Sequence, residues 1–328
     1  MNATLDHAPP RYIDSSPVGI GRAHAKTILV GEHAVVYGAP ALAMPVPGLN
    51  ATVRAVAAEG RFVDSDLYTG ATSGAPHRLG PVVTAIHATL EHLRSRNGIA
   101  VRGVKVRIRS DIPPDRGLGS SAAVAAAIAE AVAGAYEMTL EGAARFDIAQ
   151  EAERHAHGNP SGLDARTVLA SGPIQFHEGR IRPLAIGSDL SFVLADSGVP
   201  GSTATAVAGV RALHDTDLGT VDRIIASLAD LAAEGEHALR DGDLAAVGRG
   251  MSAAHELLGH LGVSIPELDN LVAAALHGGA LGAKLTGGGL GGCVLALAPS
   301  GADARRLAAD LREAGAPSVW TMNVSSSR

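Results

Sequence analysis

The chain has 328 residues, of which 46% are hydrophobic and 18% are charged, so we expect about two globular domains, each with its own core. Acidic residues outnumber basic ones by 33 to 27, and no block of Lys or Arg stands out, so no nucleic-acid partner is expected. No stretch approaches the about 20 apolar residues that span a bilayer, and no basic, apolar leader is present, so we expect no membrane partner and a cytoplasmic location.

The first half of the chain predicts strands and helices in alternation. Residues 1–17 are polar and contain prolines, which indicates a loose tail. Apolar and β-branched residues then predict three short strands, and spacings of three and four predict two helices, the second of them rich in alanine. The strands are expected at 27–30, 51–56 and 104–108, and the helices at 82–93 and after Ser120.

The second half predicts an α+β domain with helices on one face of a sheet. A domain boundary is expected near Ile186, after a polar, glycine-containing run at 177–182, which gives domains at 18–186 and 187–328. The hydrophobic pattern beyond it predicts alternating strands and helices. The strands are expected at 192–194, 283–285, 293–297 and near Val319, and the helices between 203 and 260 and at 302–314.

A glycine-containing loop leads directly into the alanine-rich helix at residues 112–123. Gly117 and Gly119 allow bare backbone N–H groups to converge, and the helix N-terminus adds unpaired donors and a positive dipole end. A phosphate chain suits such a site, although the loop matches neither common phosphate-binding glycine motif. The alternative is a turn in which Ser120 only caps the helix.

Two further segments place charged or flexible residues beside apolar strands. Lys26 opens the strand at 27–30, and Gly31-Glu32-His33 follows it, which is consistent with a site or with a snorkelling lysine and a surface turn. The glycines at 287–292 connect two strands, either as a hairpin or as a loop that closes over a ligand. The single cysteine, Cys293, excludes an intramolecular disulfide and is expected to be buried.

A fourth segment places two carboxylates, Glu153 and Asp164, across a helix end and a turn. One of them could hold a metal while the other handles a hydroxyl. The alternatives are a solvated glutamate and an aspartate that caps a helix starting about Ala165. His155 and His157 lack a third ligand nearby, so we interpret them as surface or site-edge residues and not as a zinc site.

These four segments, in this order, resemble the GHMP family of small-molecule kinases over roughly residues 19–297. The stretch Gly31-Glu32-His33-Ala34-Val35-Val36-Tyr37-Gly38 is similar to the branch that phosphorylates mevalonate, and the segments at 196–198 and 201–203 resemble a substrate segment of the family. Ala25 and Asp115-Arg116 stand where many relatives have glycine, as in a bacterial-type subgroup. These departures affect the expected path of the loop over the nucleotide.

The resemblance implies an α+β, two-domain GHMP kinase fold, with an N-terminal α/β domain, a C-terminal ferredoxin-like domain and the active site in the cleft between them. It implies ATP and mevalonate as substrates and Mg²⁺ as cofactor, held by Ser121 and Glu153. The implied nucleotide-binding residues are Pro114, Arg116, Gly117, Leu118, Gly119, Ser120, Ser121 and Ala122. A monomer and a homodimer both stay open.

The resemblance also implies roles around the acceptor. Asp164 would face the primary hydroxyl as general base or orienting acceptor, and Lys26 would stabilise the alkoxide. The substrate's carboxylate and tertiary hydroxyl would be held by Glu32, His33 and Thr203, with Ser202 as a weaker candidate. The alternatives are another kinase of the family, for phosphomevalonate or homoserine, and a non-catalytic relative that senses a ligand.

Overall fold

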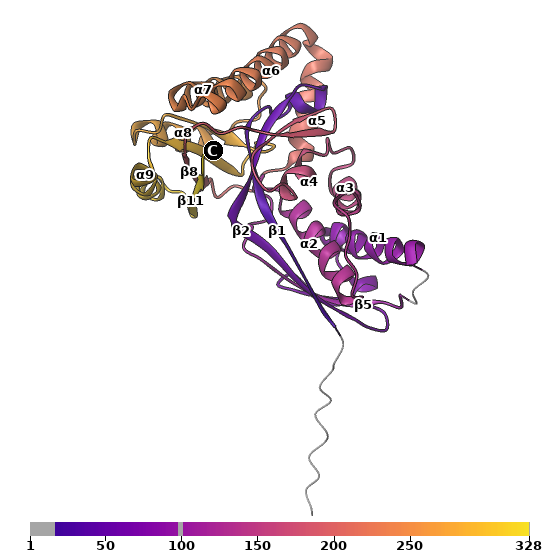
Figure 1. Ribbon diagram of the computed structural model, residues 1–328. Coiled ribbons are helices and arrows are strands. Elements are labelled where there is room, and N and C mark those ends of the chain that lie inside the picture. The colour runs from indigo at the N-terminus through magenta and orange to yellow at the C-terminus, as the bar shows by residue number, and fades with distance from the viewer. Residues whose placement is uncertain (1–16, 98–100, 328) are drawn as a thin grey trace, which may run out of the picture.

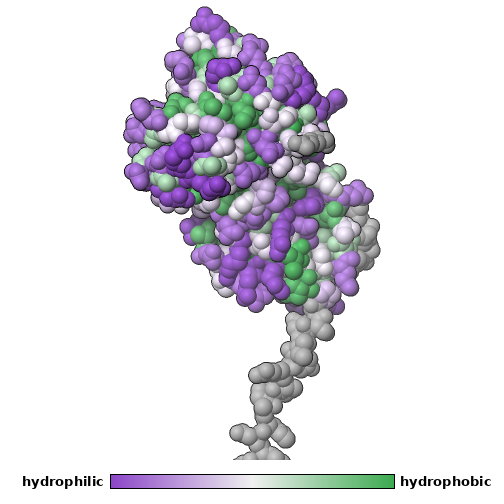
Figure 2. Space-filling model, turned by 60° about the vertical axis from the view of Figure 1, so that its left-hand side comes forward, coloured by the Kyte–Doolittle hydropathy of each residue, from purple (hydrophilic) through white to green (hydrophobic). Residues whose placement is uncertain are grey.

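The computed structural model describes residues 17–97 and 101–327. The predicted tail at 1–17 lies outside the described residues except for Pro17. Figure 1 shows two lobes, one formed by the first half of the chain and the other by the second half, and Figure 2 shows the same two lobes in a space-filling view. No helix among the described residues is both long and apolar enough to cross a membrane.

The first lobe contains a seven-stranded sheet in the order β4-β3-β5-β2-β6-β7, with β1 paired to β2. The two longest strands, β1 and β2, run antiparallel from Val18↔Val56 to Val30↔Leu42. The strands are β1 (Val18–Val30), β2 (Ala41–Ala57), β3 (Arg61–Ser65), β4 (Tyr68–Ala71), β5 (Val104–Ser110), β6 (Ile174–His177) and β7 (Arg180–Pro183). The three strands predicted from sequence in this half are confirmed, but two of them extend much further.

Four helices accompany this sheet, and α2 packs directly along β1 (Figure 1). Gly19 and Gly21 of β1 lie so close to α2 that a Cβ on either would clash with a backbone carbonyl oxygen, of Ala131 or Ala127. The alanines of α2 and the glycines of β1 therefore permit one close backbone-to-backbone contact. The helices are α1 (Gly80–Asn97), α2 (Ser120–Ala135), α3 (Gly142–His157) and α4 (Leu163–Val168), and a 3₁₀ helix, η1 (Ala34–Tyr37), follows β1.

The second lobe contains a four-stranded antiparallel sheet in the order β11-β8-β10-β9. Its chain order of strand, helices, two strands, helix and strand is that of a ferredoxin-like domain, as predicted. The strands are β8 (Leu190–Asp196), β9 (Gly282–Thr286), β10 (Cys293–Ala298) and β11 (Val319–Val324). The helices are α5 (Thr203–Thr216), α6 (Leu218–Asp241), α7 (Leu244–His260), α8 (Pro266–His277) and α9 (Gly301–Glu313).

Polar contacts join the two lobes where β1 meets β9. The Thr27 hydroxyl lies 3.0 Å from the Thr286 hydroxyl, and the backbone N–H of Ile28 donates to the same Thr286 oxygen at 2.9 Å. Strands of the first sheet end at Pro183 and those of the second begin at Leu190, on either side of the boundary that we predict near Ile186. Cys293 is buried in β10, as expected.

Candidate active site

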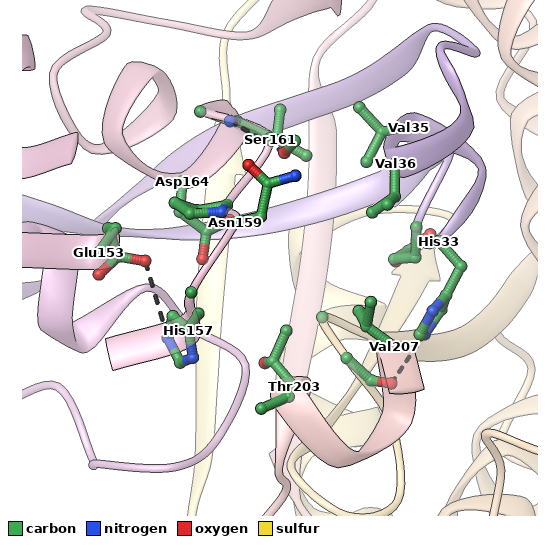
Figure 3. Close-up of a pocket in the computed structure, with 18 of the residues that line it drawn as sticks. His33, Val35, Val36, Glu153, His157, Asn159, Ser161, Asp164, Thr203 and Val207 are labelled. Carbon is green, nitrogen blue, oxygen red and sulfur yellow. Dashed lines mark hydrogen bonds and ion pairs between the residues drawn. The ribbon is translucent and has the colours of Figure 1, made fainter. Parts of the chain in front are cut away.

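A cavity of about 450 Å³ lies where the two lobes meet. Its walls come from the end of β1 and η1, from the turn between α3 and α4, from the first turns of α5, and from the β9–β10 loop (Figure 3). The sequence-predicted residues that line it are Lys26, Glu32, His33, Glu153, Asp164 and Thr203. Segments separated by more than 100 residues therefore form one continuous site.

An ion pair between Lys26 and Asp164 lies in the wall of this cavity. Lys26 Nζ is 2.9 Å from Asp164 Oδ1, the lysine side chain is only 2% exposed, and that of Asp164 is 34% exposed. Gly119 leaves room for the lysine, because a Cβ there would lie 2.8 Å from Lys26 Cγ. The snorkelling alternative for Lys26 is therefore wrong. The capping alternative for Asp164 is also wrong, since α4 begins at Leu163 after Gly162.

Glu153 and Ser121 contribute two buried oxygen atoms that have no hydrogen-bond partner among the described residues. Glu153 is 2% exposed, which excludes the solvated glutamate, and its Oε1 and the Ser121 Oγ are both unpartnered. Burial, and secondly the charge of Asp164, raises the pKa of Glu153 to about 7. Unsatisfied carboxylate and hydroxyl oxygens are the donors that Mg²⁺ prefers, so these residues fit the expected ion.

The histidines after Glu153 do not form a metal site. His157 Nε2 lies 3.7 Å from Glu153 Oε2, and burial lowers the pKa of His157 (Figure 3). His155 Nδ1 lies 3.3 Å from Thr84 Oγ1. Among the described residues, no group of three or more His, Cys, Asp and Glu side chains could hold a metal ion. A magnesium ion bound here would therefore need oxygen ligands from phosphate and water as well.

The glycine-containing loop between β5 and α2 lies beside the cavity and touches the second lobe. Gly117 and Gly119 have φ angles of 72° and 70°, in the left-handed region that favours glycine. Gly119 is the N-cap of α2, so the alternative in which Ser120 caps this helix is wrong. A Cβ on Gly117 would lie 2.8 Å from the Thr286 carbonyl oxygen, so the loop and the β9–β10 loop close on one another.

Three of the predicted nucleotide-binding residues have side chains that are engaged elsewhere. Leu118 and Ala122 are buried, so only their backbone atoms are available to a ligand. Arg116 Nε lies 2.7 Å from Asp196 Oδ1, which directs the guanidinium to β8. Of the others, Pro114 is exposed, and the Ser120 hydroxyl donates to the Ile112 carbonyl at 3.5 Å.

The predicted acceptor residues differ in how the structure uses them. His33, at φ 60°, donates from Nε2 to the Gly288 carbonyl at 2.8 Å, and burial lowers the pKa of this histidine. Thr203 begins α5 and lines the cavity. Ser202 lies outside the cavity lining, because it is the N-cap of α5 and its hydroxyl accepts the Thr205 N–H at 3.3 Å.

Glu32 has a partner that sequence reasoning missed, the fully buried Lys284 of β9. The Lys284 ammonium donates to Glu32 Oε1 and to the Leu285 carbonyl, the latter at 2.6 Å. Glu32 Oε2 has no partner in the part of the chain that the structure describes. The only signal in the sequence was a lysine in the middle of an apolar strand. Arg211 of α5 also lines the cavity and was missed, because nothing local in the sequence marks it.

The architecture and the paired, buried charges beside a glycine loop are those of a small-molecule kinase. Residues 82–172 match the family described as GHMP kinases N terminal domain, and residues 236–317 match GHMP kinases C terminal. A mevalonate kinase of Aeropyrum pernix is 36% identical over 290 residues, which cover 85% of this chain and 88% of that protein. The chain belongs to the GHMP kinase family.

Solved structures of mevalonate kinases share the whole fold. The L. major mevalonate kinase in complex with R-mevalonate superposes with a TM-score of 0.80 and 29% identity, covering 94% of this chain and 96% of that one. The Methanococcus jannaschii mevalonate kinase gives a TM-score of 0.77 and 26% identity, covering 97% and 100%. The predicted fold class, with its two domains and the cleft between them, is thereby confirmed.

Proposed function

We propose that this protein is a mevalonate kinase, which transfers the γ-phosphoryl group of ATP to the primary hydroxyl of mevalonate and releases 5-phosphomevalonate and ADP. The observation that carries this proposal is the Lys26–Asp164 pair, which lines the cavity between the lobes, beside a glycine loop at a helix N-terminus. The sequence and structural likeness to mevalonate kinases supports mevalonate as the acceptor. A cytoplasmic location stays a prediction, and the choice between monomer and homodimer stays open.

The paired charges suit the reacting hydroxyl. Asp164 is the more exposed partner, so its carboxylate can accept or orient the hydroxyl proton of an acceptor in the cavity. Lys26, held 2.9 Å away, places a positive charge where the alkoxide develops. Phosphoryl transfer needs little covalent catalysis by the protein. We therefore expect that these two residues accelerate the reaction mainly by positioning the hydroxyl and by neutralising charge.

The glycine loop suits the phosphates of ATP. The loop meets the second lobe where Gly117 lies against Gly287, and it leads into the N-terminus of α2, whose first backbone N–H groups are donors that a phosphate can use. We assign Ser121 and Glu153 as the protein ligands of Mg²⁺, because they supply the unpartnered buried oxygens. When bound, Mg²⁺ would neutralise charge on the phosphates. Closing the lobes around this point would exclude water from the transfer.

The acceptor cavity has polar and apolar walls that match a short, branched hydroxy acid. Glu32 Oε2 is buried without a partner and can accept from a hydroxyl group, and Thr203 can donate. Val35, Val36 and Val207 lie on the side of the cavity away from Glu153 and Asp164, and they give it an apolar surface that can contact a methyl group (Figure 3).

The direct test is a coupled ADP-release assay with Mg²⁺, ATP and three acceptors: mevalonate, phosphomevalonate and homoserine. We expect mevalonate to be phosphorylated with the highest kcat/KM, and ³¹P NMR should show a phosphate monoester on the primary carbon. An Asp164→Asn preparation serves as control for contaminating kinases. Equal or faster turnover of either other acceptor would exclude the proposed substrate.

A further inference from the structure

One face of α5 lines the acceptor cavity over two helical turns. Thr203, Val207 and Arg211, spaced by four, all contribute to its wall. Helical side chains lean towards the N-terminus of their helix, so Arg211 reaches back over Val207 and into the cavity region. Arg211 therefore belongs to the α5 and η1 side of the cavity, where it interacts electrostatically with Tyr37. Figure 3 shows Val207, Val35 and Val36 on this side, away from Glu153 and Asp164.

Arg211 differs from the other cations of the cavity because it is exposed to solvent and no described residue neutralises its charge. Lys26 is paired with Asp164, and the Lys284 ammonium, beside the cavity, is paired with Glu32. Within the described part of the chain, Arg211 has no ion pair and no hydrogen bond, and Asp215, one turn further along α5, lies beyond ion-pair distance.

The other titratable neighbours of Arg211 do not supply a negative charge. Tyr37 of η1 interacts with Arg211 electrostatically, but burial raises the pKa of this phenol, so it is neutral at pH 7. His33, with its lowered pKa, is also neutral. The acceptor end of the cavity consequently presents one uncompensated positive charge next to apolar valine side chains.

We propose that Arg211 is the residue that binds the carboxylate of the acceptor and so selects an anionic over a neutral alcohol. The inference rests on the proposed function and adds an orientation to it: the carboxylate lies against α5 and the primary hydroxyl against Asp164. A guanidinium can hold a carboxylate with two parallel hydrogen bonds, which fixes direction as well as charge. Binding at two opposite ends would hold the reacting hydroxyl in line with the phosphate.

The test compares Arg211→Met with Arg211→Lys, and uses Arg249→Met as a matched control. Arg249 lies on α7, is exposed and makes no ion pair among the described residues, so its replacement changes net charge by the same amount far from the cavity. Each protein is assayed with mevalonate and with 3-methylpentane-1,3,5-triol, in which a CH₂OH group replaces the carboxylate. Wild-type turnover of mevalonate tests the proposed function first and separately.

We expect Arg211→Met to raise the KM for mevalonate by about 10- to 100-fold with a much smaller change in kcat, because a charge-assisted contact is lost. Arg211→Lys should recover part of this loss, and Arg249→Met should behave as wild type. Activity on the triol should be weak and equal in wild type and Arg211→Met. An unchanged KM for mevalonate in Arg211→Met, or equal losses on both acceptors, would overturn the assignment while leaving the kinase activity established.

Discussion

Lys284 of β9 and Glu32, which follows β1, form a buried ion pair that joins the two lobes. Both side chains are almost completely inaccessible, at 0% and 1% exposure. The same lysine donates to the Leu285 carbonyl, so its ammonium is satisfied by both lobes at once. One wall of the acceptor cavity is therefore complete only when the second lobe is packed against the first.

This ion pair predicts that loss of Lys284 strongly destabilises the protein, and that a second substitution at Glu32 restores most of the stability. Lys284→Met leaves the Glu32 carboxylate buried without its partner, which should lower the free energy of unfolding by about 3–5 kcal/mol. Adding Glu32→Gln removes the orphaned charge, so the double variant should recover most of the loss. Urea unfolding of the three proteins gives the comparison. A double variant as unstable as Lys284→Met alone would show that the charge pair is not the cause.

The raised pKa of Glu153 predicts a pH-dependent gain in stability for Glu153→Gln. The unfolded chain ionises this carboxyl near 4.5 and the folded protein at about 7, so folding is favoured most below pH 4.5 and loses stability as the pH rises to 7. Removing the carboxylate should therefore raise the free energy of unfolding at pH 8, by up to about 3 kcal/mol. Near pH 4.5 the two proteins should agree.

Urea unfolding at the two pH values, without nucleotide, measures this difference. Burial lowers the pKa values of His33, His157 and His255, so protonation of each destabilises the fold as the pH falls. His33 and His255 contribute equally to both proteins and cancel in the comparison. Because His157 Nε2 lies 3.7 Å from Glu153 Oε2, the comparison is made in a His157→Gln background. A gain of the same size at both pH values would mean that the effect is not ionisation.

The assignment of Ser121 and Glu153 as metal ligands predicts that substituting either one weakens the apparent affinity for Mg²⁺ without loss of fold. Ser121→Ala removes one of the two unpartnered oxygens, and Glu153→Gln replaces an anionic ligand by a neutral one. Both should raise the Mg²⁺ concentration that gives half-maximal activity, and Glu153→Gln should do so more. Ser95→Ala, on α1 away from the cavity, is the control. Unchanged Mg²⁺ dependence in both variants would contradict the assignment.

The contact between Lys26 and Asp164 predicts that their contributions to catalysis overlap. Asp164→Asn keeps the shape but removes the charge, and Lys26→Met keeps the apolar stem, so each should lower kcat by roughly 10²- to 10⁴-fold. Because both act on one oxygen, the double variant should be less impaired than the product of the single effects. Initial rates and thermal melts on the same preparations check this. Near-normal kcat in either single variant would remove that residue from the mechanism.

By themselves, the residues of the chain determined those features whose physical cause is local. The loop that ends at Gly119 predicts a helix start, because glycines, serines and a run of alanines lie next to one another in the sequence. The strands and helices of the second half follow from hydrophobic periodicity, and the four motifs in order indicated the family. The nearness of Lys26, Glu153 and Asp164 came from that resemblance, and the structure now provides the distance between the lysine and the aspartate.

Tertiary structure alone decided features that depend on what packs against them. The first half of β1 escaped prediction because its inward positions are Gly19, Gly21 and Ala23, which carry almost no hydrophobic signal and are suited only to the approach of α2. A lysine is unexpected in a buried strand, and Lys284 is explained only by its ion pair with Glu32, which is 252 residues away in the sequence. No local pattern in the sequence marks Arg211. Its place in the cavity follows from the position of α5 beside η1, where the Tyr37 and His214 rings lie 5.2 Å apart. Burial and charge compensation are properties of the assembled fold.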